Sequence, residues 1–252
     1  MGRFKKMRKQ KLSATVCALT ACAALFAAAS EEKKETPPLP TEHETQDVEG
    51  WSVRVDKRLL DEKNADLGKR ALRVLSNALF ELKVVVNAEK VKRLQQVPIW
   101  LDLTHGKLTS MQYHPGAGWL KANGYSEQLA KCVHIPDAAR FVSPRELHEQ
   151  PWAVLHELAH SYHDQVLGFD DKDIKDAWKK FKESKKYDSV LHIRGMMTKH
   201  YALTDPMEFF AEMSESYFGA NDFYPFNNAE LKREEPELHA LLVKIWGPLN
   251  EK

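Results

Sequence analysis

Two histidines stand four residues apart in an otherwise apolar stretch, and this pattern limits the fold more than any other feature of the chain. Residues 154–160 read VLHELAH and include His156 and His160. Pro151 precedes the stretch and Gly168 follows it, as is typical of the start and the end of a helix. Residues i and i+4 of a helix share a face, so both imidazoles can reach one point. Burying these rings among apolar side chains is costly unless a partner satisfies them, and a metal ion would do so.

The residues beside the two histidines indicate which kind of metal site this helix would carry. The sequence H-E-x-x-H places Glu157 next to the metal without making it a ligand, where it can activate a metal-bound water. A catalytic zinc takes three protein ligands and keeps one position open. A longer zinc pattern would need Gly at position 163 and His at position 166, but the chain has His163 and Val166. We therefore expect the third ligand to come from another helix.

A second apolar segment supplies a glutamate that can complete such a site. Asp205-Pro206 predicts the start of a helix that contains the sequence EFFAE. Glu208 and Glu212 in this helix are four residues apart and share a face. We expect Glu208 to bind zinc and Glu212 to accept a hydrogen bond from the other nitrogen of a ligand imidazole. Tyr201 precedes Glu208 by seven residues, and a phenol near the zinc would stabilise the oxyanion of a tetrahedral intermediate.

These two segments together resemble a known peptidase family. The sequence VLHELAHSYHD at 154–164, followed by HYALTDPMEFFAEMSESYFG at 200–219, is similar to the catalytic domain of the anthrax lethal-factor-type gluzincins. It is more similar still to their short secreted relatives in harmless bacteria. That family has a tyrosine seven residues before the glutamate of an E-F-F-A-E sequence, so the resemblance implies Tyr201 as the oxyanion stabiliser and Glu208 as the third ligand. Further similar blocks cover most of 51–250; they imply a zincin fold but no particular substrate or role.

The residues and the resemblance predict an exported zinc metalloendopeptidase that acts on a peptide or protein. Zinc would lower the pKa of its bound water to about 7. Glu157 would take the proton of that water and pass it to the leaving amine, while zinc and Tyr201 hold the oxyanion. We expect the substrate to lie extended along an edge strand formed by Cys132–Pro136.

Two other classes of function stay open at this point. One is a zinc-stabilised exported binding domain of zincin fold without peptidase activity, although the intact Glu157 favours the enzyme. The other is an exported interaction protein that binds no metal and carries H-E-x-x-H by chance. Metal content separates the last from the other two.

The N-terminal residues are typical of an export signal. The first eleven residues include six Lys or Arg, and the stretch from Leu12 to Ala29 has no charge and ends in small residues. We expect a signal peptide over 1–30 and a secreted or periplasmic protein. Two alternatives remain: LTAC, ending at Cys22, resembles a lipobox and would lead to lipid anchoring, and an uncleaved run would be a marginal membrane anchor.

The patterns after the signal predict one α+β domain. Residues 31–50 are polar and contain three prolines, and we expect a flexible linker there and a folded domain over 51–252. Strands are expected at 52–55, 97–103, 111–114 and 132–136, and helices at 66–86, after Asn87, and at 151–166, 172–185, 206–218 and 235–246. Because the strands lie in the N-terminal half, we expect a small mixed sheet packed on the active-site helix, with the second ligand-bearing helix beside it.

Charge and the remaining polar residues add a few expectations. The chain has 37 Lys and Arg and 36 Asp and Glu, a net charge of +1, which gives no reason to expect a nucleic-acid partner. We expect a monomer that meets a membrane only through its signal or a lipid on Cys22. Cys132 is expected to be a buried apolar residue. His163 is expected at the surface or the core edge, and Asp164 either orients His160 or lies in solvent. His114 and His200 are expected to be structural.

Overall fold

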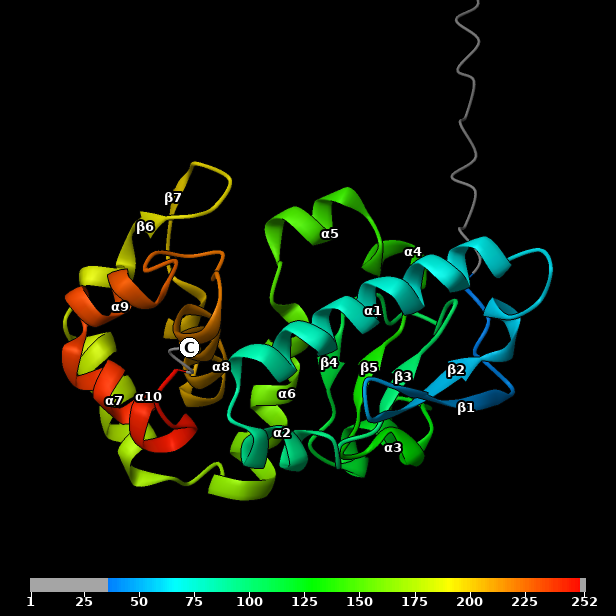
Figure 1. The fold of residues 1–252 in the computed structure, drawn as a ribbon, viewed down its shortest axis with the longest axis horizontal. Coiled ribbons are helices and arrows are strands. Elements are labelled where there is room, and N and C mark those ends of the chain that lie inside the picture. Colours follow the sequence, from blue (N-terminus) through cyan, green and yellow to red (C-terminus); the bar gives the residue numbers. More distant parts are fainter. Residues whose placement is uncertain (1–35, 250–252) are drawn as a thin grey trace, which may run out of the picture. The chain divides into compact units, whose positions relative to one another are not determined.

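The computed structural model describes residues 36–249 of the chain (Figure 1). The expected signal peptide over 1–30, Cys22 and residues 31–35 of the expected linker lie outside the described residues. Between residues 36 and 249, no helix is both long and apolar enough to cross a membrane.

A five-stranded mixed sheet forms the N-terminal part of the fold. Its strand order is β1-β2-β3-β5-β4, in which β2, β3 and β5 run parallel and the two edge strands run antiparallel to their neighbours. The strands are β1 His43–Val48, β2 Trp51–Asp56, β3 Ile99–Leu101, β4 Gln112–Tyr113 and β5 Val133–Ile135. A separate antiparallel hairpin comprises β6 Val190–Leu191 and β7 Met197–Thr198. The expectation of an α+β fold with a small mixed sheet is therefore confirmed.

The two faces of the sheet differ, because successive side chains of a strand point to opposite sides. Ile99 and Leu101 of β3 are buried in the main hydrophobic core. Trp100, between them, belongs to a much smaller core with Leu120, Leu129 and Cys132. Trp100 pairs with His134 of β5, so His134 faces the same side as Trp100. One face of the sheet is thus covered by the main core and the other by a small apolar cluster.

Helix α1 covers the face of the sheet that carries the main core (Figure 1). It spans Ala65–Val85 and buries Leu75, Leu79 and Leu82 at helical spacing, as the sequence predicts, together with Ala71. Helix α2 (Ala88–Leu94) begins after Asn87, whose side chain accepts a hydrogen bond from the backbone of Glu89. The other helices are α3 Ala117–Ala122, α4 Ala138–Phe141, α5 Pro144–Glu149, α6 Ala153–Tyr162, α7 Lys172–Glu183, α8 Pro206–Phe218, α9 Asn228–Glu234 and α10 Pro236–Trp246.

Helix α6 lies between the sheet and the C-terminal helices. It contacts β4 and β5 on one side and α8 on the other. The indole of Trp246, at the end of α10, packs against the rings of Tyr162, Phe210 and Phe218 and so joins α6, α8 and α10. This packing fixes the position of α8 relative to α6, on which the geometry of the candidate site depends.

Two expectations about the N-terminal half are wrong. The linker expected over 31–50 includes residues 43–48, which form β1 and pair antiparallel with β2 along its whole length. Backbone pairing, rather than an apolar pattern, holds this strand in the sheet, because most of its side chains are exposed or only half-buried. The segment expected as an edge strand, Cys132–Pro136, forms β5, which lies between β3 and β4; the edge next to α6 is β4.

Candidate metal centre

Helix α6 presents both histidines of the H-E-x-x-H sequence on one face. Val154, Leu155, Leu158 and Ala159 are buried, and the helix places His156 and His160 at the edge of this packing, where they are half-buried. Their Nε2 atoms lie 3.1 Å apart. Helix α6 passes directly into a π-helical turn, His163–Leu167, and ends at Gly168, which has a φ of +83°. Glycine adopts this left-handed conformation without the strain that a Cβ would add.

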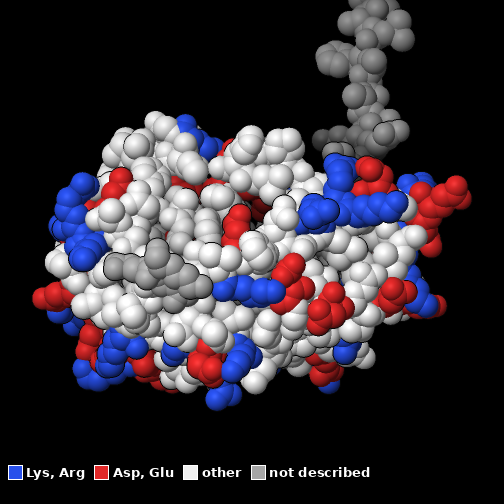
Figure 2. All heavy atoms as spheres, in the orientation of Figure 1, with Lys and Arg blue, Asp and Glu red and all other residues white. Residues whose placement is uncertain are grey.

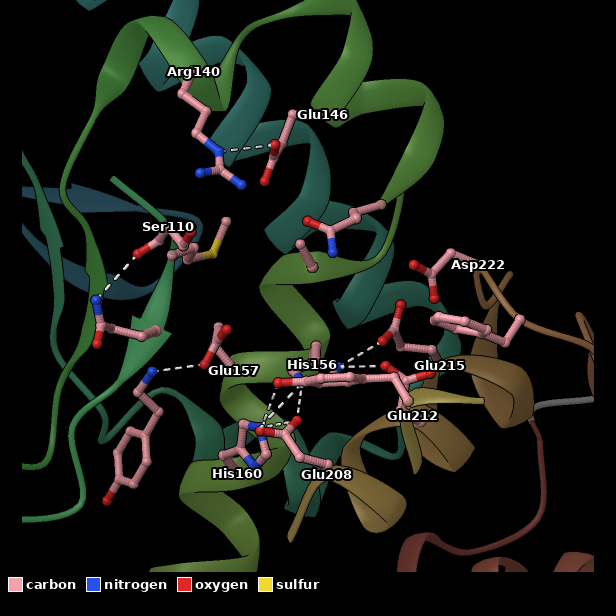
Figure 3. Close-up of a pocket in the computed structure, with 17 residues that line it drawn as sticks. Ser110, Arg140, Glu146, His156, Glu157, His160, Glu208, Glu212, Glu215 and Asp222 are labelled. Atoms are coloured by element: carbon pink, nitrogen blue, oxygen red, sulfur yellow. Dashed lines mark hydrogen bonds and ion pairs between the residues drawn. The ribbon is translucent and has the colours of Figure 1, made fainter. Parts of the chain in front are cut away.

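Helix α8 brings Glu208 to the same point (Figure 3). The helix starts as the sequence predicts: the side chain of Asp205 accepts hydrogen bonds from the backbone N–H groups of Met207 and Glu208. Oε2 of Glu208 lies 3.1 Å from Nε2 of His156 and 3.3 Å from Nε2 of His160. The structure therefore brings together the three side chains expected as ligands, from two helices that lie about fifty residues apart in the chain.

The second nitrogen of His156 contacts a carboxylate that the sequence did not predict. Its Nδ1 atom lies 2.7 Å from Oε1 of Glu215. The expected partner, Glu212, lies 3.7 Å away, beyond hydrogen-bonding distance, so that expectation is wrong. Glu215 lies seven residues after Glu208, and this two-turn spacing along one helix face is the sequence signal that could have identified it.

The hydrogen bond to Glu215 determines what the other nitrogen of His156 can do. If Nδ1–H donates to Glu215, Nε2 of the neutral ring carries a lone pair, and it points at Oε2 of Glu208, which also can only accept. Two acceptors at 3.1 Å need a proton or a metal ion between them. Burial by itself would lower the pKa of His156, but hydrogen bonds to Glu208 and Glu215 raise it well above its usual value, so the two carboxylates favour positive charge here, either on the ring or on a bound ion.

The donor set of this site fits zinc. Two imidazole nitrogens and one carboxylate oxygen are a common ligand set of catalytic zinc. Their separations of 3.1 to 3.3 Å match the roughly 3.3 Å between ligand atoms of a tetrahedral ion with bonds of about 2 Å. Burial tends to raise the pKa of Glu208, but hydrogen bonds from His156 and His160 lower it well below its usual range, so the carboxylate is ionised and able to bind a cation.

Glu157 lies beside the three ligand atoms and contacts the edge of the sheet. Its Oε2 accepts a 2.6 Å hydrogen bond from the backbone N–H of Tyr113, in β4 (Figure 3). Burial raises the pKa of Glu157, and this effect exceeds the opposing effects of His156, His160 and the Tyr113 amide. A carboxylate whose pKa is raised toward neutrality is better suited to accept and return a proton.

Tyr201 lies in the segment that leads into α8, on the open side of the site. Its hydroxyl is 3.4 Å from Oε1 of Glu208, and 47% of the residue is exposed. Burial, followed by the charge of Glu208, raises the pKa of Tyr201 to about 12, so the hydroxyl keeps its proton at neutral pH. It is therefore available as a hydrogen-bond donor to a group held next to Glu208.

The ligand atoms open into a cleft of about 430 Å³. Residues 110–113, Tyr201 and Phe223 are among its lining residues. Ser110 and Asp222, which also line it, lie on opposite sides of the ligand atoms (Figure 3). Figure 2 shows acidic side chains in a hollow of the visible face, while acidic and basic side chains are interspersed elsewhere on it.

Asp222, which lines the cleft, has an unusual pKa. Burial, followed by the charge of Glu215, raises the pKa of Asp222 to about 7. Asp222 is a second residue of the cleft that sequence reasoning missed, and no pattern around it points to the site.

The other polar residues singled out in the sequence lie outside the cleft. His163 is fully buried between the rings of Phe169 and Phe210, so the position expected at the surface or the core edge is wrong. Neither of its ring nitrogens has a hydrogen-bond partner among the described residues. Asp164 accepts a hydrogen bond from the hydroxyl of Tyr113 and pairs with Lys131. Cys132 is buried, as expected, and His114 and His200, which were expected to be structural, are buried as well.

Comparisons with known proteins do not extend these observations. No protein-family model, no curated protein and no solved structure matches the chain.

Proposed function

We propose that this protein is a zinc-dependent metalloendopeptidase of the gluzincin type, exported from the cell and acting on a peptide or protein. The observation that carries the proposal is the convergence of His156, His160 and Glu208 on one point, with the carboxylate of Glu157 beside them. Neither a surface helix nor an ordinary core requires two imidazoles and two carboxylates to meet in this way. The resemblance to lethal-factor-type peptidases and their short secreted relatives, stated above from the residues, agrees with this assignment.

His156, His160 and Glu208 would hold the zinc, and the cleft would leave its fourth position open. When bound, zinc supplies Lewis acidity and lowers the pKa of water. Glu215 fixes the tautomer of His156 by accepting the proton on Nδ1, which leaves Nε2 free to bind.

Glu157 is the general base of the proposed reaction. Its half-buried carboxylate takes a proton from the attacking water and returns it to the leaving amine. The backbone N–H of Tyr113 holds one carboxylate oxygen at 2.6 Å, so the other oxygen is the one available for proton transfer. Tyr201, which stays protonated at neutral pH, donates a hydrogen bond to the oxyanion that forms at the scissile carbonyl.

The edge strand β4 provides a place for an extended substrate. The residues just before β5 bind the backbone of His114, whose N–H donates to the C=O of Cys132 and whose C=O accepts from the N–H of Lys131. In an antiparallel pair, backbone groups alternate between the two edges, so those of Tyr113 point away from β5 and toward the cleft. The N–H of Tyr113 already donates to Glu157, which leaves its C=O to accept a hydrogen bond from a peptide. A peptide that pairs with this edge would lie between β4 and the ligand atoms. This replaces β5, which the sequence had suggested for the role.

The proposed activity is tested by comparing wild-type protein with Glu157→Gln on a peptide library read by mass spectrometry. We expect the variant to keep its zinc and to lose at least 10²- to 10³-fold in rate, because the general base is gone. Glu183→Gln is the matched control, since Glu183 is an exposed glutamate on α7, outside the cleft. A Glu157→Gln variant with full activity contradicts the mechanism. Zinc binding without hydrolysis in wild-type protein indicates the binding domain instead, and absence of metal indicates an interaction protein.

A further inference from the structure

Exposed apolar side chains gather on the hairpin of β6 and β7. Leu191 and Met197 lie directly opposite each other on the two strands, and both are exposed, Met197 by 62%. Ile193 and Met196 lie at the turn between the strands and are exposed as well. We call these four residues the apolar tip. Single exposed apolar side chains are common, but several of them side by side mark a surface that binds a partner.

The cleft does not use the outer side of this hairpin. His192 and Thr198 line a hollow of about 500 Å³ beside the cleft, and Asp222 lines both. Successive side chains of a strand point to opposite faces. Leu191 and Met197, which alternate with His192 and Thr198, therefore point away from the hollow. One face of the hairpin thus belongs to the hollow, and the other is open to solvent.

Basic side chains accompany the apolar tip. Residues 185–199 include one acidic residue and four basic ones, a local charge of +3, and the basic ones are Lys185, Lys186, Arg194 and Lys199. All four are exposed. Among residues 36–249, Lys186 pairs with Glu235 and Arg194 with Glu149, whereas Lys185 and Lys199 form no ion pair. Lys199 directly follows β7, and the alternation of the strand places it on the same face as Met197.

We propose that the apolar tip docks on a phospholipid bilayer that carries anionic headgroups. The four apolar side chains would enter the boundary between headgroups and acyl chains, while the long side chains of Arg194 and Lys199 reach the lipid phosphates. This contact is additional to the signal peptide or lipid that the sequence suggests as the link to a membrane. It does not depend on the proposed peptidase function.

Shape and charge favour a membrane over a protein partner. Figure 1 shows the hairpin at the upper edge of the view, where its turn projects beyond α8 and α9. A fluid lipid layer takes up a projecting apolar tip of any shape, whereas a protein would need a matching cavity. Each basic residue near an anionic membrane raises the affinity about fivefold, so the local excess of positive charge favours anionic headgroups.

Backbone hydrogen bonds hold the hairpin against the rest of the domain. The N–H of Tyr224 donates to the C=O of Leu191, and the N–H of Ile193 donates to the C=O of Asp222. The tip is therefore already ordered before it meets a membrane, which lowers the entropic cost of docking. Because Asp222 also lines the cleft, a membrane at the tip would lie close to the cleft.

A fluorescent label on the tip reports docking directly. Full-length protein with Cys17→Ser and Cys22→Ser is labelled at Ile193→Cys with an environment-sensitive dye, and Cys132 is kept because it is buried. Vesicles of phosphatidylglycerol and phosphatidylcholine should shift the emission to the blue. Vesicles of phosphatidylcholine alone, or added salt, should shift it much less. A dye at Phe80→Cys, an exposed position on α1, should not respond, although this protein has the same N-terminal residues.

Substitutions then test the apolar and the basic parts separately. In protein labelled at position 193, Leu191→Gln/Met197→Gln should lower the ratio of docked to free tip at least tenfold, because two apolar side chains no longer leave water. Lys199→Gln should lower it about fivefold. Lys69→Gln, which removes an exposed lysine from α1, is the matched control and should leave it unchanged. Lys199→Gln also covers the case in which the double variant fails to fold, since it lies outside both strands.

Three results would overturn the proposal. In the first, the dye at position 193 does not respond to anionic vesicles, even when the protein sediments with them. In the second, the folded double variant responds as strongly as the wild type. In the third, the emission shifts without vesicles as the protein concentration rises, which would mean that a second copy of the chain covers the tip. None of these readings involves zinc or hydrolysis, so they leave the peptidase proposal to its own test.

Discussion

Nδ1 of His156 lies 2.7 Å from Oε1 of Glu215, whereas Oε1 of Glu212 is 3.7 Å away. The two glutamates are neighbours on the same face of α8, but only Glu215 is close enough to accept the proton of the imidazole. Among residues 36–249, Oε2 of Glu212 has no hydrogen-bond partner. Glu215 therefore orients His156, the proposed zinc ligand, and Glu212 occupies the space beside it.

This difference predicts unequal effects of two isosteric substitutions. If the protein has the proposed function, Glu215→Gln should weaken zinc binding at His156, His160 and Glu208 by about 10- to 100-fold, because the charged acceptor of His156 Nδ1–H is lost. Glu212→Gln should weaken it much less. Reactivation of metal-free enzyme by titrated zinc measures this site alone. A greater loss in Glu212→Gln than in Glu215→Gln would reverse the assignment.

Tyr201→Phe should lower turnover about 10²-fold and leave the zinc content unchanged, because the variant loses a donor to the oxyanion and no ligand. The hydroxyl is 3.4 Å from Glu208, too far for a strong bond, so Glu208 does not depend on it. Tyr125→Phe serves as the control, since Tyr125 lies against Trp119 on the other face of the sheet. Loss of zinc in Tyr201→Phe would show that the tyrosine is structural.

Two glycines should respond in opposite ways to the same substitution. A Cβ on Gly68, in α1, would lie 2.3 Å from the backbone oxygen of Leu59, so Gly68→Ala should reduce the free energy of unfolding by about 1–3 kcal/mol. A Cβ on Gly118, in α3, would meet no atom within 4 Å, so Gly118→Ala should increase it by about 0.5–1 kcal/mol. Urea unfolding of both variants checks this, and a stabilised Gly68→Ala would show that α1 can shift away from Leu59.

His200 should make stability depend on pH in the acid range. Burial lowers its pKa from 6.5 to about 3, so the folded state keeps a neutral ring while the unfolded chain binds a proton below pH 6.5. The free energy of unfolding is therefore unaffected by this group above pH 6.5 and falls as the pH is lowered toward 3. The loss between neutral pH and pH 4 is about 3 kcal/mol.

His200→Asn tests this pH dependence, because an Asn side chain can still accept the backbone N–H of Ala202, as Nδ1 of His200 does. Urea unfolding at pH 7 and pH 4 should show a smaller loss of stability on acidification in His200→Asn than in the wild type. His148→Asn, with its exposed position, should behave like the wild type. An unchanged loss in His200→Asn would mean that other groups cause the acid sensitivity.

Several features of the fold and the site depend on local chemistry and could be predicted from the sequence alone. The four-residue spacing of His156 and His160 puts both rings on one face of any helix they occupy. The caps at Asn87 and Asp205 form with backbone groups two or three residues away, so neighbouring residues are sufficient to identify them. The apolar spacing of α1 likewise defines its buried face before any partner is known.

Other features depend on how distant elements meet, and only the tertiary structure decided them. Glu212 and Glu215 are both acidic and on one face of α8, and the packing of α8 on α6 determines which of them reaches His156. Whether β5 is an edge strand depends on β4 pairing beside it. His43 lies in a polar segment that reads as a linker, yet it reaches Asp102, 59 residues away. Apolar periodicity and capping residues predict interactions between residues that are close in the sequence. The contacts of Glu215, β5 and His43 instead arise from how whole strands and helices are placed relative to one another.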